Sequence, residues 1–523
     1  MVLSMLYWLN KSTKRFHAVL LIGTFSGFLG LISRTSVVDL DLFHEMALFR
    51  EALQLGRLPD HDLYSYIPTV FPVIHHEWGT GAFIYLLTVK LGLGGFGLMT
   101  LKFFLTFFIV INCYRFALQQ GSDNFIYVYC AFFSVVLGWI GFTTIRAQLF
   151  TLCLLLVLLF IIERDRKNET WTLWWLVPLF ILWINLHGGF VVGIGLVVLY
   201  ILERFIIHWL NGNNFYKSLY EVKKHLLVLL VICIGLQVNP YGSDYFPYLW
   251  EAITLDRTDL IKEWRPLWTL PPLTFLVYCG AVLLTILPFW YKRYIEVPGL
   301  VLVMVTAIAG LLHFRHLSLF ALLFLCYVPA YLRGTPVGYA IRNIFSENSN
   351  ILTMLYIVVT ILFGGYSVSN QFWKLKVPTD MASHEKSLWV YPVGAVNYLK
   401  EQNFTGNLMT PYNMGAYVSW KMYPKVKVSM DSRFEVAYTY EAVVENGLFY
   451  EGVSFWYEIS KRYNTDGLLV PNWSKVKQII DEEPKSWKLI YSDGAYSVYM
   501  AKNIAMNYPV TQLGNKTSIG TFP

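Results

Sequence analysis

The chain has 523 residues, of which 56% are hydrophobic and only 14% are charged. Soluble globular domains carry about 25% charged residues, so the composition excludes a soluble protein over most of this length. The formal net charge of +7 does not require a nucleic-acid partner. Most of the excess Lys and Arg lies in short loops between apolar runs, where it sets membrane topology.

Apolar runs of spanning length recur through the first 369 residues. A bilayer crossing needs about 20 predominantly apolar residues, and the first such run, which follows Lys11, is expected to be an uncleaved first helix. About twelve runs meet this description, near residues 16–34, 78–94, 97–117, 124–142, 147–163, 171–186, 188–208, 225–239, 272–290, 297–313, 316–332 and 351–369.

The basic loops predict the orientation of these helices. Lys and Arg cluster in four loops, which together with the N-terminus mark the cytoplasmic side: 164–167, 204–224, 292–293 and 333–342. Everything after residue 370 then faces outward. A cytoplasmic N-terminus and an outer C-terminus require an odd number of crossings, so one run between residues 79 and 163 is miscounted. We therefore expect a polytopic α-helical membrane protein with about 11–13 transmembrane helices.

Residues 370–523 have a different character from the membrane-spanning part, residues 1–369. Alternating apolar residues at 425–430 and 496–500 predict strands, and 392–402 and 473–482 are typical of helices. Trp and Tyr are too frequent for a disordered tail. The sequence therefore predicts a small C-terminal α/β domain outside the membrane.

The first outer loop, residues 35–78, is predicted to contain an amphipathic helix lying on the membrane surface. Asp39 or Asp41 is placed to cap this helix, and Gly56 is placed to end it. Its apolar residues recur at helical spacing: Leu42, Met46, Phe49 and Leu53.

The same loop is rich in carboxylates and imidazoles. Such groups at a membrane edge suit a divalent cation, or a general base beside a phosphate group. The alternative is structural, with Asp41 as a helix cap and His75 and His76 in a solvated turn. The polar set comprises Asp39, Asp41, His44, Glu45, Asp60, His61, Asp62, His75, His76 and Glu77.

Further ionisable residues lie at the outward ends of other apolar runs. Ionisable groups at membrane depth are costly and are functional candidates by default, and Arg is a natural partner for phosphate. Snorkelling to the interface is the alternative for the arginines, and a tight turn accounts for the glycines after His187. The candidates are Arg146, His187, His313, Arg315 and His316.

Together these features resemble the GT-C class of integral-membrane glycosyltransferases. The resemblance rests on Asp39-Leu-Asp41 through Glu77-Trp78, on Asn185-Leu-His187-Gly-Gly, and on the motifs Asn239-Pro-Tyr-Gly242 and Glu263-Trp-Arg265-Pro. Asn413-Met-Gly415 is similar in layout to the acceptor-recognition motif of oligosaccharyltransferase catalytic subunits. It lacks the Trp pair and has Asn413 in place of Asp, so protein N-glycosylation is not implied, and a turn between strands is the alternative.

The resemblance implies transfer of a sugar from a polyprenyl-phosphate donor to an acceptor on the outer side, with inversion at the sugar. Asp41 or Asp39 would be the catalytic base. Arg315, Arg146, His313 and His316 would bind the donor phosphate. The expected acceptor contacts are His75, His76, Glu77, His187 and Asn413. A divalent cation, Mg²⁺ or Mn²⁺, would be held by Asp39, Asp41, His76 and Glu77, and a metal-independent reaction is the alternative.

Two other functions are consistent with the sequence. A transporter or flippase would place ionisable residues near the middle of the membrane and show an internal repeat, whereas here they gather at one predicted face. A non-catalytic envelope assembly protein would depend on the outer domain and tolerate neutral substitutions in the first loop. The acceptor and the sugar are not defined by the sequence.

Overall fold

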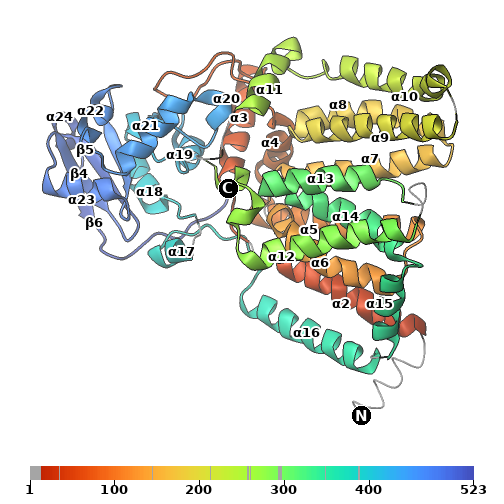
Figure 1. The fold of residues 1–523 in the computed structure, drawn as a ribbon. Coiled ribbons are helices and arrows are strands. Elements are labelled where there is room, and N and C mark those ends of the chain that lie inside the picture. Colours follow the sequence, from red (N-terminus) through yellow and green to blue (C-terminus); the bar gives the residue numbers. More distant parts are fainter. Residues whose placement is uncertain are drawn as a thin grey trace. The chain divides into compact units, whose positions relative to one another are not determined.

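The computed structural model describes residues 13–33, 36–143, 145–212, 214–255, 258, 261–292, 297–347, 349–386 and 389–523, and these are mostly helical (Figure 1). Lys11 and Arg293, which contributed to the predicted topology, lie outside the described residues. The chain divides into two compact units. The helical unit comprises Met1–Ser36, Met99–Asn239 and Leu255–Trp373, and the mixed unit comprises Val37–Leu98, Pro240–Thr254 and Lys374–Pro523.

The helical unit consists of long apolar helices that run side by side (Figure 1). Its elements are α2 (Thr13–Ser33), α5 (Gly94–Gln119, which begins in the mixed unit), α6 (Asn124–Thr143), α7 (Gln148–Arg166), η2 (Thr170–Trp175), α8 (Leu176–Leu186), α9 (Phe190–Leu210), α10 (Phe215–Gly235), η4 (Lys262–Trp264), η5 (Leu267–Thr269), α12 (Pro272–Ile286), η6 (Leu287–Trp290), α13 (Leu300–Leu312), η8 (Phe314–His316), α14 (Leu317–Leu332), α15 (Pro336–Glu347) and α16 (Ser349–Ser369).

Five helical segments in the described part of the chain are long and apolar enough to cross a membrane. They differ in burial: 83% of the Phe314–Leu332 segment is buried inside the protein, but only 6% of α16 is. Ile351, Ile361 and Leu362 on α16 are each 67% exposed. An apolar helix with exposed Ile and Leu side chains is stable in lipid rather than in water. These helices indicate a membrane protein.

One predicted spanning run does not form a long helix. Residues 78–94 fold as α4 (Trp78–Tyr85) followed by the single π-helical turn η1 (Leu86–Lys90), and both belong to the mixed unit. Each of the other predicted runs coincides with a helix between α2 and α16. The number of crossings and the orientation of the two termini stay predictions.

The first loop folds as part of the mixed unit. Helix α3 spans Asp41–Leu55 and ends at Gly56, whose φ of 69° is the left-handed conformation that glycine adopts readily. Leu42 and Met46 of the predicted membrane-facing side are fully buried in protein, together with Phe43, whereas Leu53 of that side is 49% exposed. Phe43 makes edge contacts with the rings of Tyr391 and Tyr417, at 5.5 and 5.1 Å.

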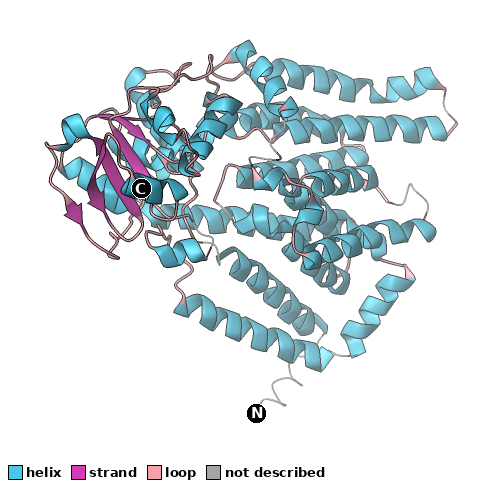
Figure 2. Ribbon diagram, turned by 60° about the vertical axis from the view of Figure 1, so that its left-hand side comes forward, coloured by secondary structure: helices cyan, strands magenta, loops and turns pink. Residues whose placement is uncertain are grey.

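The C-terminal residues form a six-stranded mixed sheet in the order β2-β1-β3-β5-β4-β6. Figure 2 shows the strands in magenta, with helices beside them. The β1/β2, β1/β3 and β4/β6 pairs are parallel, and the β3/β5 and β4/β5 pairs are antiparallel. The strands are β1 (Gly406–Met409), β2 (Val426–Val428), β3 (Gly467–Pro471), β4 (Trp487–Ser492), β5 (Tyr496–Ala501) and β6 (Thr511–Gln512). Both predicted strands are present, as β2 and β5.

Helices surround this sheet within the mixed unit. Phe449, Trp456, Trp487 and Tyr499 form part of a buried cluster between the sheet and its helices. The predicted helices at 392–402 and 473–482 appear as α18 and α23. Besides α3, α4 and η1, the described helices of the mixed unit are η3 (Gly242–Asp244), α11 (Tyr245–Thr254), α17 (Met381–Glu385), α18 (Val393–Glu401), α19 (Gly415–Met422), α20 (Phe434–Ala437), α21 (Tyr440–Tyr450), α22 (Trp456–Lys461), α23 (Lys475–Glu482) and α24 (Lys502–Ala505).

Candidate functional site

The mixed unit contains a buried ionic network centred on Arg433. Its guanidinium binds Asp431 through two nitrogens, with Nε–Oδ1 and Nη2–Oδ2 distances of 2.8 and 2.7 Å, and its Nη1 lies 2.7 Å from Asp62 Oδ1. The three side chains are at most 2% exposed. Burial would raise the pKa of Asp431, but the charge and hydrogen bonds of Arg433 outweigh it and lower the net value.

Backbone pairing joins the first loop to the sheet at this network. Ser65 forms a parallel bridge with Val428 of β2, and the Val428 amide donates to the Tyr64 carbonyl at 2.9 Å. Asp431 and Arg433 follow the carboxyl end of β2, which is parallel to β1. In α/β sheets the carboxyl ends of parallel strands are where ligand sites commonly form. The pairing therefore positions Asp62 of the loop beside Arg433.

Helix α3 contributes a buried carboxyl group, Glu45, which lies near the side chain of Glu77. Glu45 is 3% exposed. Burial raises its pKa, and the neighbouring charge of Glu77 raises it further. The two carboxyl groups therefore oppose each other's ionisation.

Three imidazoles, those of His44, His75 and His76, line the same cavity as this carboxyl pair. Burial lowers the pKa of His44 to about 4, with further contributions from Asp431, which raises it, and Arg433, which lowers it. Burial also lowers the pKa of His75, which is 5% exposed. The Nδ1 of His76 lies 2.8 Å from the hydroxyl of Tyr248 on α11, and its Nε2 lies 3.5 Å from Glu77.

These groups line a small cavity of about 30 Å³, bounded among others by His44, Glu45, His75, Glu77 and Arg433. Within the described residues, Glu45 Oε2 and His75 Nε2 are buried and have no hydrogen-bond partner. A buried polar atom without a partner is costly. The cavity is large enough for one water.

The two predicted catalytic aspartates lie at the start of α3 and differ in role. Asp39 is 4% exposed, and its Oδ1 accepts the backbone N–H of Asp41 at 3.1 Å. This interaction satisfies an amide at the first turn of the helix. Asp41 is the first helical residue and is half-buried. The geometry thus assigns the capping role to Asp39 and leaves Asp41 as the better candidate for a base.

A glycine on α4 allows α3 and α4 to pack closely at this site. A Cβ on Gly81 would lie 2.5 Å from the backbone carbonyl oxygen of Glu45. No other residue type fits at this separation without a shift of one helix. Because Glu77 directly precedes α4, the close contact holds its carboxyl group near that of Glu45.

The predicted metal ligands do not form a recognisable metal site. Across the described residues, no group of three or more His, Cys, Asp or Glu side chains is arranged to hold a metal ion. The set of Asp39, Asp41, His76 and Glu77 therefore lacks geometric support. A requirement for Mg²⁺ or Mn²⁺ stays a prediction for the assay below.

The predicted phosphate-binding residues gather in the helical unit around Trp264, and we call this group the Trp264 cluster. Arg146 pairs with Glu263 at 3.1 Å, and the Arg315 guanidinium lies 4.8 Å from the Trp264 ring. His313 Nδ1 lies 2.6 Å from the Trp264 carbonyl oxygen, so it donates there. The members are Arg146, Glu263, Trp264, His313, Arg315 and His316, whose ring makes an edge contact with Trp264 at 5.9 Å.

Two of the predicted acceptor residues, His187 and Asn413, lie at turns next to helices. The Nδ1 of His187 lies 2.7 Å from Thr151 Oγ1 and accepts the Gly189 amide at 3.0 Å, which holds the turn before α9. Asn413 lies in the turn between β1 and α19. There Gly415 is required, because a Cβ would lie 1.8 Å from the Met430 carbonyl oxygen. This geometry matches the turn alternative, and acceptor contacts by either residue stay predictions.

The most buried members of the site were not predicted from the sequence. Arg433 and Asp431 lie in a polar stretch of the C-terminal domain that resembles many solvated turns. Their partner Asp62 lies in a different part of the chain, and only the fold brings the three together. The one local signal is the spacing Asp431-Ser-Arg433 directly after a short apolar strand.

Comparison with known proteins does not place the chain in a family. No model of a protein family matches the chain, and no curated protein matches it.

Proposed function

We propose that this protein is a membrane glycosyltransferase that transfers a sugar from a polyprenyl-phosphate donor to an acceptor. The observation that carries the proposal is the gathering of first-loop carboxylates and imidazoles in one unit. Glu45 and Glu77 pair, His44 and His75 are held neutral, and Asp41 lies at the start of the same helix. Carboxylates and neutral imidazoles are the side chains that most often act as general bases.

In the proposed reaction the acceptor hydroxyl or amide attacks the anomeric carbon of the donor sugar. Asp41 takes the proton that the acceptor loses. The bond between the anomeric carbon and the phosphate oxygen breaks, and its electron pair leaves with the polyprenyl phosphate. Attack from the face opposite the leaving phosphate inverts the configuration at the sugar.

The buried network around Arg433 supports this assignment through positioning. Arg433 fixes Asp62 of the first loop and Asp431 of the C-terminal domain in a rigid arrangement. Catalytic groups work best when supporting ion pairs and hydrogen bonds hold them in place. Donor-phosphate binding by the Trp264 cluster is a separate proposal, supported by the charges of Arg146 and Arg315 and their suitability for phosphate.

The test is a transfer assay with the purified full chain and radiolabelled polyprenyl-phosphate sugars. Membrane extracts supply acceptors, and parallel reactions contain Mg²⁺, Mn²⁺ or a chelator. The proposal predicts label in a new covalent product and release of polyprenyl phosphate. Movement of label into sealed vesicles without a covalent product would instead establish transport.

A further inference from the structure

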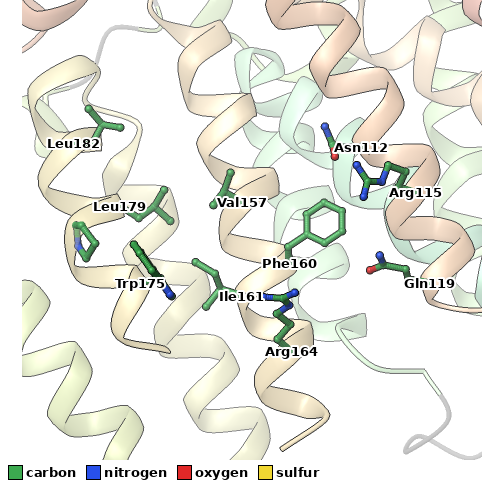
Figure 3. Close-up of a pocket in the computed structure, with 11 residues that line it drawn as sticks. Asn112, Arg115, Gln119, Val157, Phe160, Ile161, Arg164, Trp175, Leu179 and Leu182 are labelled. Atoms are coloured by element: carbon green, nitrogen blue, oxygen red, sulfur yellow. The ribbon is translucent and has the colours of Figure 1, made fainter. Parts of the chain in front are cut away.

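The helical unit contains a pocket of about 590 Å³, in the size range of ligand-binding pockets. Figure 3 shows its walls: residues of α5 on one side, Trp175 of η2 and residues of α8 on the other, and α7 between them. Its lining residues are Asn112, Arg115, Gln119, Val157, Phe160, Ile161, Arg164, Trp175, Pro178, Leu179 and Leu182. The surface is mostly apolar and carries two guanidinium groups.

Arg164 differs from the two charged residues that follow it on the chain, Asp165 and Arg166, which are paired between helices. Arg166 forms two hydrogen bonds with Glu203, at 2.6 and 2.9 Å, and Asp165 bonds to His225 at 2.7 Å. These interactions neutralise the buried charges between α7, α9 and α10. Arg164 instead lines the pocket (Figure 3), and its ion pair with Glu169 is long and exposed, at 3.7 Å.

Arg115 provides the second cation. It is exposed on α5 and forms no hydrogen bond or ion pair with the described residues. Figure 3 shows Arg115 and Arg164 on neighbouring helices, with Phe160 between them. Two guanidinium groups that are not neutralised by strong protein pairs favour an anionic group, and phosphate accepts hydrogen bonds from both.

The neighbouring aromatic residues are typical of a membrane interface. Trp171, Trp174 and Trp175 on η2 are 61%, 49% and 61% exposed. Trp is enriched at the level of lipid headgroups. The apolar walls formed by Val157, Leu179 and Leu182 lie further along α7 and α8, where acyl chains are found. Basic pockets between membrane helices are known to bind anionic headgroups.

We propose that this pocket is a binding site for one anionic glycerophospholipid, with its phosphate between Arg115 and Arg164 and an acyl chain along the apolar walls. The end of α7 that carries Arg164 is predicted to face the cytoplasm, so the site is distinct from the first-loop residues of the proposed function. The bound lipid would fill an otherwise open gap between α5, α7 and α8.

Native mass spectrometry of the purified full chain, released from nanodiscs into mild detergent, tests this proposal. The lipid probes are phosphatidylglycerol, phosphatidylcholine and a polyprenyl phosphate, and inorganic phosphate is added as a competitor. We expect one retained phosphatidylglycerol per chain, weak retention of phosphatidylcholine, and no displacement by inorganic phosphate. Preferred retention of the polyprenyl phosphate, or displacement by inorganic phosphate, would overturn the assignment.

Substitutions in the pocket test whether these side chains hold the lipid. Arg115→Gln/Arg164→Gln should lower phosphatidylglycerol retention at least about tenfold, the loss of two charge-assisted contacts. Leu182→Glu keeps both arginines and should lower retention through the apolar wall. The matched control, Lys217→Gln/Lys223→Gln, removes the same charge from α10 and should retain the lipid. Equal loss in this control would show diffuse attraction and overturn the proposal, and so would full retention in both pocket variants. The readout is independent of enzymatic activity.

Discussion

At the scale of residues, the Arg433 network combines burial with one cation shared between two carboxylates. A buried ion pair adds little net stability, but removing one partner leaves the others buried and unpaired, at about 3–5 kcal/mol. Asp62 and Asp431 both lose their cation when Arg433 is removed. The network therefore matters more for specifying the arrangement of the loop than for overall stability.

Arg433→Met should destabilise the mixed unit by about 3–5 kcal/mol, because two buried carboxylates remain without a cation. Thermal unfolding in detergent, with Trp fluorescence as the signal, measures this change. Arg462→Met is the matched control, because Arg462 is 52% exposed in its pair with Glu445 and exposed pairs contribute about 0–1 kcal/mol. Equal shifts in the two variants would contradict the assigned burial.

The imidazoles predict a dependence of stability on pH. His44 has a pKa of about 4 in the folded protein, below the usual value of about 6.5. The unfolded chain therefore binds more protons between these values. The contribution of His44 is fully present above pH about 6.5 and is lost as the pH falls to about 4. The lowered pKa of His75 gives a dependence on pH in the same direction. Glu45 acts in the opposite direction because its pKa is raised. Its contribution to stability is lost as the pH rises above about 4.3.

The double variant His44→Gln/His75→Gln should therefore lose less stability than the parent chain between pH about 7 and 5. Each imidazole contributes a slope of at most about 1.4 kcal/mol per pH unit. Unfolding midpoints of both proteins at the two pH values measure the difference. An identical pH dependence would mean that neither imidazole is held neutral by burial.

At the scale of elements, sequence periodicity predicts which segments are helical but not what surrounds them. Leu42 and Met46 on the apolar face of α3 were assigned to the membrane surface, and the structure buries both in protein. The 78–94 run was assigned to a span for the same reason. Hydropathy measures how apolar a segment is, and a helix buried in protein has the same composition as one in lipid.

The contact between α3 and α4 gives a test at this scale. Gly81→Ala should destabilise the mixed unit by about 1–3 kcal/mol, because its Cβ would lie 2.5 Å from the Glu45 carbonyl oxygen. Gly447→Ala on α21 is the control: a Cβ there meets nothing within 4 Å, so a gain of about 0.5–1 kcal/mol is expected. A neutral Gly81→Ala would show that the two helices are not in close contact.

At the scale of the whole molecule, the sequence predicts a membrane part followed by a C-terminal α/β domain. The structure contains apolar helices that indicate a membrane protein and a small mixed sheet near the C-terminus, and its last change of unit lies at residues 373 and 374. The sequence does not predict that residues 37–98 and 240–254 fold with the C-terminal domain. That association depends on long-range contacts, such as the Tyr391 hydroxyl bonded to the Val38 carbonyl at 2.9 Å, which have no local pattern.

The candidate site follows the same division. Asp41, Glu45, His75 and Glu77 were grouped from their closeness in sequence and their chemistry. The ion pair that links their loop to Arg433 needed the fold. The kinds of ionisable side chain in the first loop were therefore evident from the sequence, but their arrangement in space was not.

The central claim is that a first-loop carboxylate drives sugar transfer, and Asp41→Asn tests it most directly. The substitution keeps the size of the side chain and removes its ability to accept a proton. Polyprenyl-phosphate sugar transfer by this variant should fall at least about a hundredfold. Asp60→Asn, a change at an exposed aspartate paired with His61, should leave the rate unchanged. Full transfer activity by a folded Asp41→Asn protein would contradict the account.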